Sequence, residues 1–100
     1  MFARVSTYTG TSDEIDEAIR QVRENVLPSV EQLDGYKGAS FLVDRQNGKS
    51  LSVTLWESEE AMRTSEEAAN SLRSEVADAL GTQMVGVERY EVGVAAQEGG

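Results

Sequence analysis

The side chains best suited to chemistry in this chain are aromatic and guanidinium groups. Trp56 could stack against a flat apolar ligand, and three tyrosines could donate a hydrogen bond or relay a proton, namely Tyr8, Tyr36 and Tyr90. Arg4 could stabilise an anionic or enolate oxygen. Structural roles compete with each of these. Trp56 could anchor a helix on a sheet, the tyrosines could pack with their hydroxyls at the rim, and Arg4 could form a salt bridge at the solvent side or at a subunit interface.

The composition excludes most metal and cofactor chemistry. The sequence contains no His and no Cys. Their absence removes the usual neutral-pH base, the commonest metal ligand, the thiolate nucleophile and the usual haem ligands. Glycine-rich phosphate-binding motifs and the G-x-S-x-G nucleophile motif do not occur in the sequence either. We therefore predict that the protein binds no metal and uses no cofactor.

Length, charge and hydropathy predict one small domain and exclude several classes of partner. A chain of 100 residues suits a single core. The net charge of −9 disfavours nucleic acid as a partner. No apolar run approaches the roughly 18 residues that a membrane span needs, so no membrane partner is expected. The first residues lack the basic and apolar regions of a secretory signal, which predicts a cytoplasmic location.

The first half of the chain predicts a strand followed by a helix. β-branched and aromatic residues over 2–9 alternate as in a strand. Thr11 and Glu14 have the spacing of a capping box, and apolar residues over 15–33 then recur at helical intervals. Pro28 lies inside this stripe, so we expect the helix to kink or break just before it.

The second half predicts two more strands, a helix and a last strand. These elements cover 39–44, 50–57, 61–80 and 84–92. Asn47-Gly48 between the first two predicts a hairpin with a type I′ turn. Ser58 is a suitable N-cap for the helix, and Gly81 is placed to end it.

The order strand–helix–strand–strand–helix–strand predicts a ferredoxin-like α+β fold. In this fold a four-stranded antiparallel sheet carries both helices on one face. The domain would cover 1–92, with 93–100 as a flexible tail. Apolar residues occur on both faces of the central hairpin, so the face without helices needs a second cover. A second copy of the chain is the simplest cover, and we predict a homodimer.

Four short segments occur in an order typical of one known family: Asn25–Pro28, Leu33–Gly38, Asn47–Gly48 and Leu55–Met62. Together they resemble the antibiotic-biosynthesis-monooxygenase type of dimeric α/β-barrel domain, over about residues 2–92. The resemblance implies a homodimer with a pocket between the sheet and the helices of each subunit. Activities of that family include cofactor-independent oxygenation of polycyclic aromatic molecules and oxidative haem breakdown.

The haem-degrading branch of that family relies on an Asn on the first strand, a Trp ending the third strand and a His on the second helix. The chain keeps the Trp as Trp56 but has Ser6 or Thr7 in place of the Asn. Where the His would be, the second helix offers Ser65 or Glu66. We therefore do not expect haem degradation.

Two rows of polar and aromatic side chains form the candidate pocket: Arg4, Ser6 and Tyr8 on the first strand, and Ser52, Thr54 and Trp56 on the third. The ferredoxin-like order makes these strands neighbours. We predict that both rows lie on one side of the sheet, under the second helix, at the wall or mouth of a cavity. Ser and Thr in a buried face leave volume and hydrogen-bonding groups where a pure core would place Leu or Val.

Two classes of function fit these predictions. One is a small oxygenase-like enzyme that holds the anion of an electron-rich aromatic substrate near dioxygen. The other is a non-catalytic dimer that binds a small apolar or aromatic ligand or serves as a scaffold. A cavity larger than roughly 300 Å³ with converging polar groups would favour the enzyme or the ligand binder, whereas a filled interior would favour the scaffold.

Overall fold

The computed structural model of the protein describes residues 1–80 and 83–96. Its elements follow the predicted order: β1 (Phe2–Thr9), α1 (Ser12–Gln21), η1 (Val22–Val26), α2 (Leu27–Val30), β2 (Tyr36–Asp44), β3 (Lys49–Trp56), α3 (Glu59–Thr64), α4 (Glu66–Leu80) and β4 (Gln83–Glu91). The cap predicted at Gly81 lies outside the described residues. No helix in these residues is long and apolar enough to cross a membrane.

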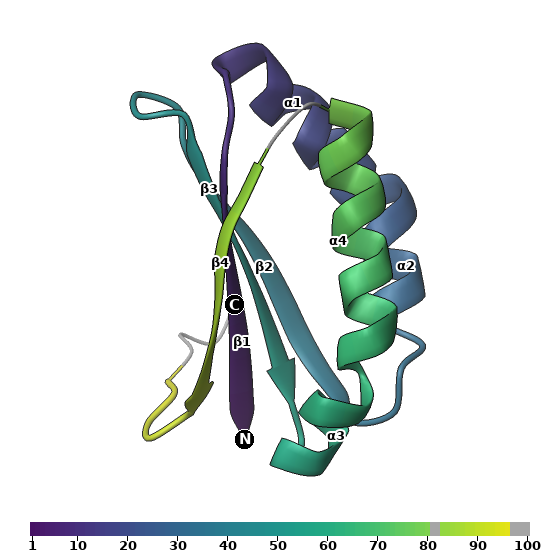
Figure 1. The fold of residues 1–100 in the computed structure, drawn as a ribbon. Coiled ribbons are helices and arrows are strands. Elements are labelled where there is room, and N and C mark those ends of the chain that lie inside the picture. Colours follow the sequence, from purple (N-terminus) through teal and green to yellow (C-terminus); the bar gives the residue numbers. More distant parts are fainter. Residues whose placement is uncertain (81–82, 97–100) are drawn as a thin grey trace.

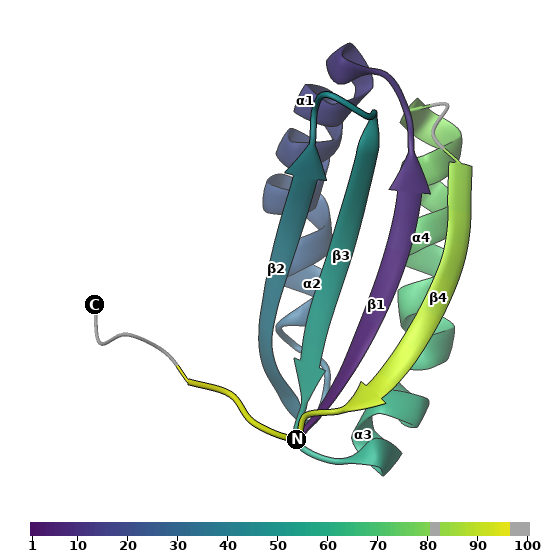
Figure 2. The same ribbon diagram turned by 90° about the vertical axis from the view of Figure 1, so that its left-hand side faces the viewer.

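The strands form one antiparallel sheet in the order β2-β3-β1-β4. Within the described residues, all the helices pack on one face of this sheet and none covers the opposite face (Figures 1 and 2). The predicted ferredoxin-like α+β fold is therefore confirmed. Beyond β4, the chain from Gly93 to Ala96 leads away from the sheet, and Val94 is 90% exposed.

The register of β1 against β3 decides which side chains face the helices. Arg4 lies opposite Thr54, and Ser6 lies opposite Ser52. Directly opposed residues of neighbouring strands share a face of the sheet. The even-numbered side chains of both strands therefore lie on one face. That face is the helix side, because Arg4 hydrogen-bonds to α3.

The first helix changes type before its proline instead of breaking. Thr11 and Glu14 form both hydrogen bonds of the predicted capping box. A π-helical turn, η1, then joins α1 to α2, and the N–H of Leu27 donates to the carbonyl of Val22. Pro28 supplies no N–H, and its ring crowds the carbonyl four residues earlier, so a regular α-helix is disfavoured here. The expected kink or break near Leu27 is therefore replaced by a change of helix type.

The hairpin between β2 and β3 is present, but the prediction of a type I′ turn is wrong. Gly48 has a φ of +64°, whereas Asn47 does not have the positive φ that type I′ requires. Instead, the Asp44 carboxylate accepts hydrogen bonds from the backbone and the side chain of Asn47, at 3.3 and 2.7 Å. A Cβ on Gly48 would lie 2.2 Å from the carbonyl oxygen of Gly10, so this position also needs glycine for space.

The second helix is divided into α3 and α4 at Ser65, where the sequence predicted one continuous helix. The Ser65 hydroxyl donates to the carbonyl of Met62 at 2.7 Å, and Arg4 donates to the same carbonyl at 3.0 Å. In a continuous helix this carbonyl would accept from Glu66 alone. The interruption therefore coincides with the attachment of the helix to β1.

Candidate functional site

Arg4 is held in a closed network beneath the junction of α3 and α4. Only 2% of its surface is exposed. One guanidinium nitrogen, Nη1, donates to the Met62 carbonyl and, at 3.1 Å, to Ser65 Oγ. The same nitrogen lies 3.9 Å from a carboxylate oxygen of Glu66, which also pairs with Arg89 of β4. Arg4 therefore forms an internal salt bridge rather than one at the solvent side, and it joins β1 to the junction of α3 and α4.

Trp56 is fully buried at the end of β3. It forms a core cluster with Val30 and Met62, and the ring of Tyr36 meets it edge-on, with 6.2 Å between centroids and an interplanar angle of 81°. The indole Nε1 donates to Thr54 Oγ1 at 3.0 Å. The contacts of Trp56 are those of an anchor between the sheet and the helices.

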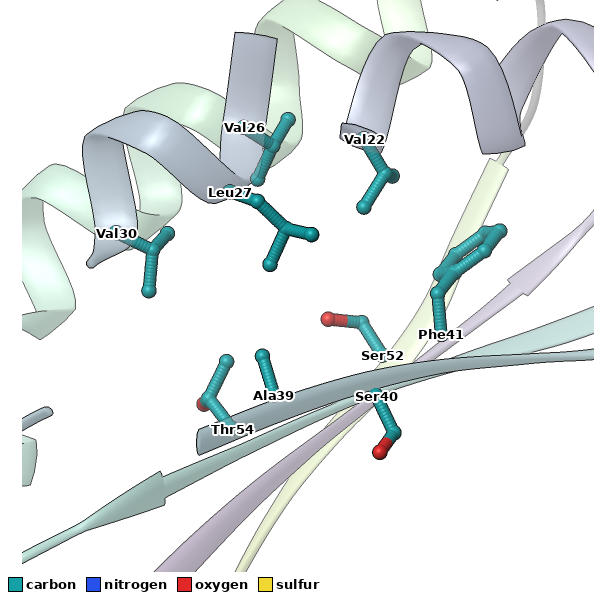
Figure 3. Close-up of a pocket in the computed structure, with 9 residues that line it drawn as sticks. All are labelled: Val22, Val26, Leu27, Val30, Ala39, Ser40, Phe41, Ser52 and Thr54. Atoms are coloured by element: carbon teal, nitrogen blue, oxygen red, sulfur yellow. The ribbon is translucent and has the colours of Figure 1, made fainter. Parts of the chain in front are cut away.

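A cavity of about 50 Å³ lies between the η1–α2 segment and strands β2 and β3 (Figure 3). It is lined by Val22, Val26, Leu27, Val30, Ala39, Ser40, Phe41, Ser52 and Thr54. Apolar side chains from the helical segment form its roof. In Figure 3 the Ser52 hydroxyl points into this space, whereas the Ser40 side chain points to the other side of the sheet. The cavity is smaller than the roughly 300 Å³ typical of ligand pockets.

The structure places both predicted rows on the helix-covered face but divides them between two environments. Ser52 and Thr54 line the cavity. Arg4 and Trp56 lie in the closed network beside it, and Ser6 and Tyr8 are also buried, without lining the cavity. The roof belongs to the first helical segment, whereas the prediction assigned it to the second helix.

Sequence reasoning missed the apolar roof as part of a site. The stripe that contains Val22, Val26 and Val30 predicted a helix face packed on the sheet, which is the usual role of such a stripe. The one available signal was Pro28, because a proline within a helix predicts a local departure from regular packing.

A second hollow of about 240 Å³ lies where α3 approaches the ends of β1 and β4. Phe2 and Met62 contribute its apolar surface, and its rim carries both acidic and basic side chains. Arg63 pairs with Glu59, and Arg89 pairs with Glu66. The cations at this hollow are therefore already neutralised within the chain.

The tyrosines of the sequence analysis are dispersed over the fold. Tyr8 is buried on β1, and Tyr36 packs against Trp56. Burial, together with the charge of Glu31, raises the pKa of Tyr36 above its usual value. Tyr90 is half-exposed on β4 and donates to Glu88 at 2.6 Å, a bond that raises the pKa of its phenol. None of the three lines the cavity under η1 and α2.

The described lining of the cavity offers no group suited to acid–base catalysis or metal binding. The side chains that line the 50 Å³ cavity are aliphatic, aromatic or hydroxyl groups, and none of them titrates near neutral pH. Within residues 1–80 and 83–96, no group of three or more acidic side chains is placed to hold a metal ion.

Comparison with known families shows to which family the chain belongs. The family described as antibiotic biosynthesis monooxygenase matches residues 1–73. The chain belongs to the antibiotic biosynthesis monooxygenase family. The uncharacterized protein Rv2557 of Mycobacterium tuberculosis is 37% identical to this family member over 92 residues, which are 92% of the chain and 41% of that protein. The chain thus spans less than half the length of this relative.

Solved structures of similar proteins share the fold. A Deinococcus radiodurans protein, assigned as an antibiotic biosynthesis monooxygenase, has a TM-score of 0.73 at 19% identity, with all of both chains covered. A monooxygenase from the gene ActVA-Orf6 of Streptomyces coelicolor, in complex with nanaomycin D, has a TM-score of 0.68 at 16% identity, with 97% and 92% covered. A dimeric ferredoxin-like protein from an uncultured marine organism has a TM-score of 0.69 at 12% identity, with 98% and 100% covered.

Proposed function

We propose that this family member is a homodimeric, cytoplasmic, monooxygenase-like protein that oxidises an electron-rich aromatic molecule with dioxygen, without a bound metal or organic cofactor. The observation that carries the proposal is the cavity in Figure 3, where an apolar helical roof faces the hydroxyl-bearing side chains of Ser52 and Thr54. Membership of the family and the fold shared with a Streptomyces coelicolor monooxygenase support the same class of reaction.

The reaction that suits these residues begins with a substrate that loses its own proton readily. None of the described side chains that line the cavity is a base at neutral pH, so in this proposal water takes the proton. In an anthrone, for example, a methylene group becomes a carbonyl group. One oxygen atom of dioxygen enters the product, and the other leaves as water with the two hydrogens of the methylene. The balance therefore needs no external reductant.

In this proposal the chain excludes water from the reacting atoms and supplies one polar contact. The apolar roof formed by Val22, Val26 and Leu27 lowers the local dielectric constant, which strengthens each remaining electrostatic interaction. The Ser52 hydroxyl can donate to an oxygen that gains negative charge during the reaction. The rings of a polycyclic substrate exceed 50 Å³ and would extend beyond the cavity.

The proposed dimer would cover the face of the sheet that has no helices (Figure 2). Apolar side chains on this face include Val5, Leu42, Leu51, Val53 and Leu55. Two copies packed through such faces would remove both from water, as in a barrel of two sheets. The marine ferredoxin-like protein of the same fold is dimeric, which supports self-association.

A non-catalytic protein that binds a small apolar ligand is the second candidate. The observation that favours it is the absence of a titratable side chain from the described lining of the cavity. Such a lining can select a ligand by shape and by one hydrogen bond, but it cannot provide acid–base catalysis.

Oxygen uptake with anthrone as the substrate tests the proposal. We expect saturable uptake above the spontaneous rate, a product one oxygen atom heavier and two hydrogens lighter, and a lower rate in Ser52→Ala. Ser40→Ala is the matched control, because its side chain points to the opposite face. Saturable binding of anthrone or nanaomycin D, without accelerated oxygen uptake, would instead favour the ligand binder. Failure to bind either molecule would favour a dimer that serves only as a scaffold.

A further inference from the structure

The cavity under η1 and α2 has the size of a very small molecule. Its 50 Å³ exceed the roughly 10–15 Å³ that a cavity needs to hold one water molecule, and fall well below the roughly 150 Å³ of a cavity that holds benzene. A diatomic molecule fits this range, whereas an aromatic ring does not.

The lining favours an apolar occupant over water. Six of the nine lining residues are Val, Leu, Ala or Phe, and Ser40 directs its side chain to the other face of the sheet. A buried water usually needs two to four polar partners. Of the two remaining hydroxyls, that of Thr54 accepts from the Trp56 indole, and in Figure 3 its methyl group, not its oxygen, points toward the roof. Among the described lining residues, Ser52 is the one whose hydroxyl points toward the roof.

Ser52 brings one hydrogen-bond donor to one end of the apolar space. Its hydroxyl points beneath Leu27, and no hydrogen bond to it is present within the described part of the chain (Figure 3). Cross-strand neighbours on the same face are Ser6 on one side and Phe41 on the other. A molecule in the cavity would therefore lie against aliphatic groups and within reach of this single O–H group.

We propose that this cavity holds dioxygen, with one of its oxygen atoms directed toward the Ser52 hydroxyl. The inference rests on the proposed oxygenase function and adds to it a place for the second substrate, separate from the aromatic rings at the cavity mouth. When the substrate anion passes one electron to dioxygen, superoxide and a substrate radical form. The Ser52 O–H stabilises the charge on superoxide, and the two radicals then join through a new C–O bond.

Nuclear magnetic resonance with dissolved dioxygen tests this placement without any substrate. Dioxygen is paramagnetic and increases the relaxation rate of nearby methyl groups. We expect the methyl groups of Val22, Val26 and Leu27 to relax severalfold faster under oxygen pressure than under nitrogen, with a larger increase than at Ile15. Ile15 is the internal control, because it is 3% exposed and does not line the cavity.

A substitution that fills the cavity gives the specificity control. Ala39→Leu should abolish the excess relaxation at the roof methyl groups, and Val26→Phe is the second variant if Ala39→Leu does not fold. Equal relaxation increases at Ile15 and at the roof would overturn the proposal. An excess that persists in both filled variants would also overturn it, because the gas would then lie elsewhere.

The outcome is separable from that of the proposed function. Excess relaxation at the roof, with no oxygen uptake on any aromatic substrate, would keep the dioxygen cavity and remove the oxygenase function. Accelerated oxygen uptake without excess relaxation would keep the enzyme and remove the cavity. With both present, Ser52→Ala should lower the rate of oxygen uptake and preserve the relaxation pattern, whereas Ser40→Ala should change neither.

Discussion

The guanidinium carbon of Arg4 lies 5.3 Å from the centroid of the Trp56 ring, and the two residues are only 2% and 0% exposed. A cation over the face of an indole is stabilised by the ring quadrupole, more so when both groups are withdrawn from water. Arg4 also binds the junction of α3 and α4, while Trp56 reaches the cavity floor through Thr54. This contact therefore connects the junction of α3 and α4 to the candidate site.

Removal of the Arg4 charge should destabilise the protein. In Arg4→Met the Met62 carbonyl and the Ser65 hydroxyl lose a charged donor. Loss of hydrogen bonds to a buried charged group predicts a decrease of about 2–4 kcal/mol in the free energy of unfolding, measured by urea denaturation. Arg20→Met is the matched control, since its ion pairs are exposed and should contribute far less to stability. Similar losses in both variants would contradict the structural role of Arg4.

The hydrogen bond from Trp56 to Thr54 should be measurable as a coupling between the two side chains. Trp56→Phe keeps an aromatic ring in the core but removes the donor, and Thr54→Val removes the acceptor. A double-mutant cycle on urea unfolding should give a coupling of about 1 kcal/mol, the usual net value of such a bond. Additive effects of the two substitutions would mean that the bond does not contribute to stability.

The sequence was sufficient to predict the fold and the shared face of the two rows. Alternation in the first and third strands assigns even-numbered residues to one side, and the pairing of Arg4 with Thr54 agrees with that parity. The capping box of Thr11 and Glu14 likewise identified the start of α1. These signals are local, so a single sequence carries them.

Local signals could not predict that the two rows divide between the cavity and the network around Arg4. Periodicity shows that Arg4 faces the helices, but not that its side chain extends to the Met62 carbonyl at the second helix. Nor does it show that η1 leaves space above Ser52. Both depend on the spacing between layers, which is set by the packing of side chains distant in the sequence.

A charge on the outer sheet face should dissociate the proposed dimer without unfolding the chain. Leu55 pairs with Ala3 of β1, on the face opposite to the helices. Analytical ultracentrifugation of the natural chain should give about twice 10.9 kDa, and Leu55→Lys should give the monomer mass with an unchanged far-ultraviolet circular dichroism spectrum. Ser29→Lys adds the same charge at an exposed position on the helical side and should remain dimeric. A monomeric natural chain at micromolar concentration would rule out the dimer.

Stability should decrease at high pH because of Tyr36. Burial and the charge of Glu31 raise the pKa of its phenol, so the folded state holds this proton more tightly than the unfolded state. A raised pKa stabilises the fold below the unfolded value, near 10, and this contribution disappears as the pH rises through the folded value. Tyr36→Phe should show a smaller loss of stability above this pH in urea titrations. Tyr90→Phe is the comparison, since the pKa of Tyr90 is raised mainly by its bond to Glu88. An unchanged alkaline slope in Tyr36→Phe would contradict the prediction.

Haemin should form no saturable complex with a shifted Soret band. The sequence contains neither His nor Cys, so a haem iron would depend on an oxygen ligand such as Tyr. At the helix position where the haem-degrading branch has its His, Ser65 is bound to Arg4, and Glu66 forms ion pairs with Arg4 and Arg89. Displacement of these contacts would leave a buried cation unpaired, which opposes entry of a macrocycle. Absorbance titration should therefore show only the weak, non-saturating changes of surface adsorption. A tight complex of one haem per chain would overturn both this prediction and the assignment of cofactor-independent chemistry.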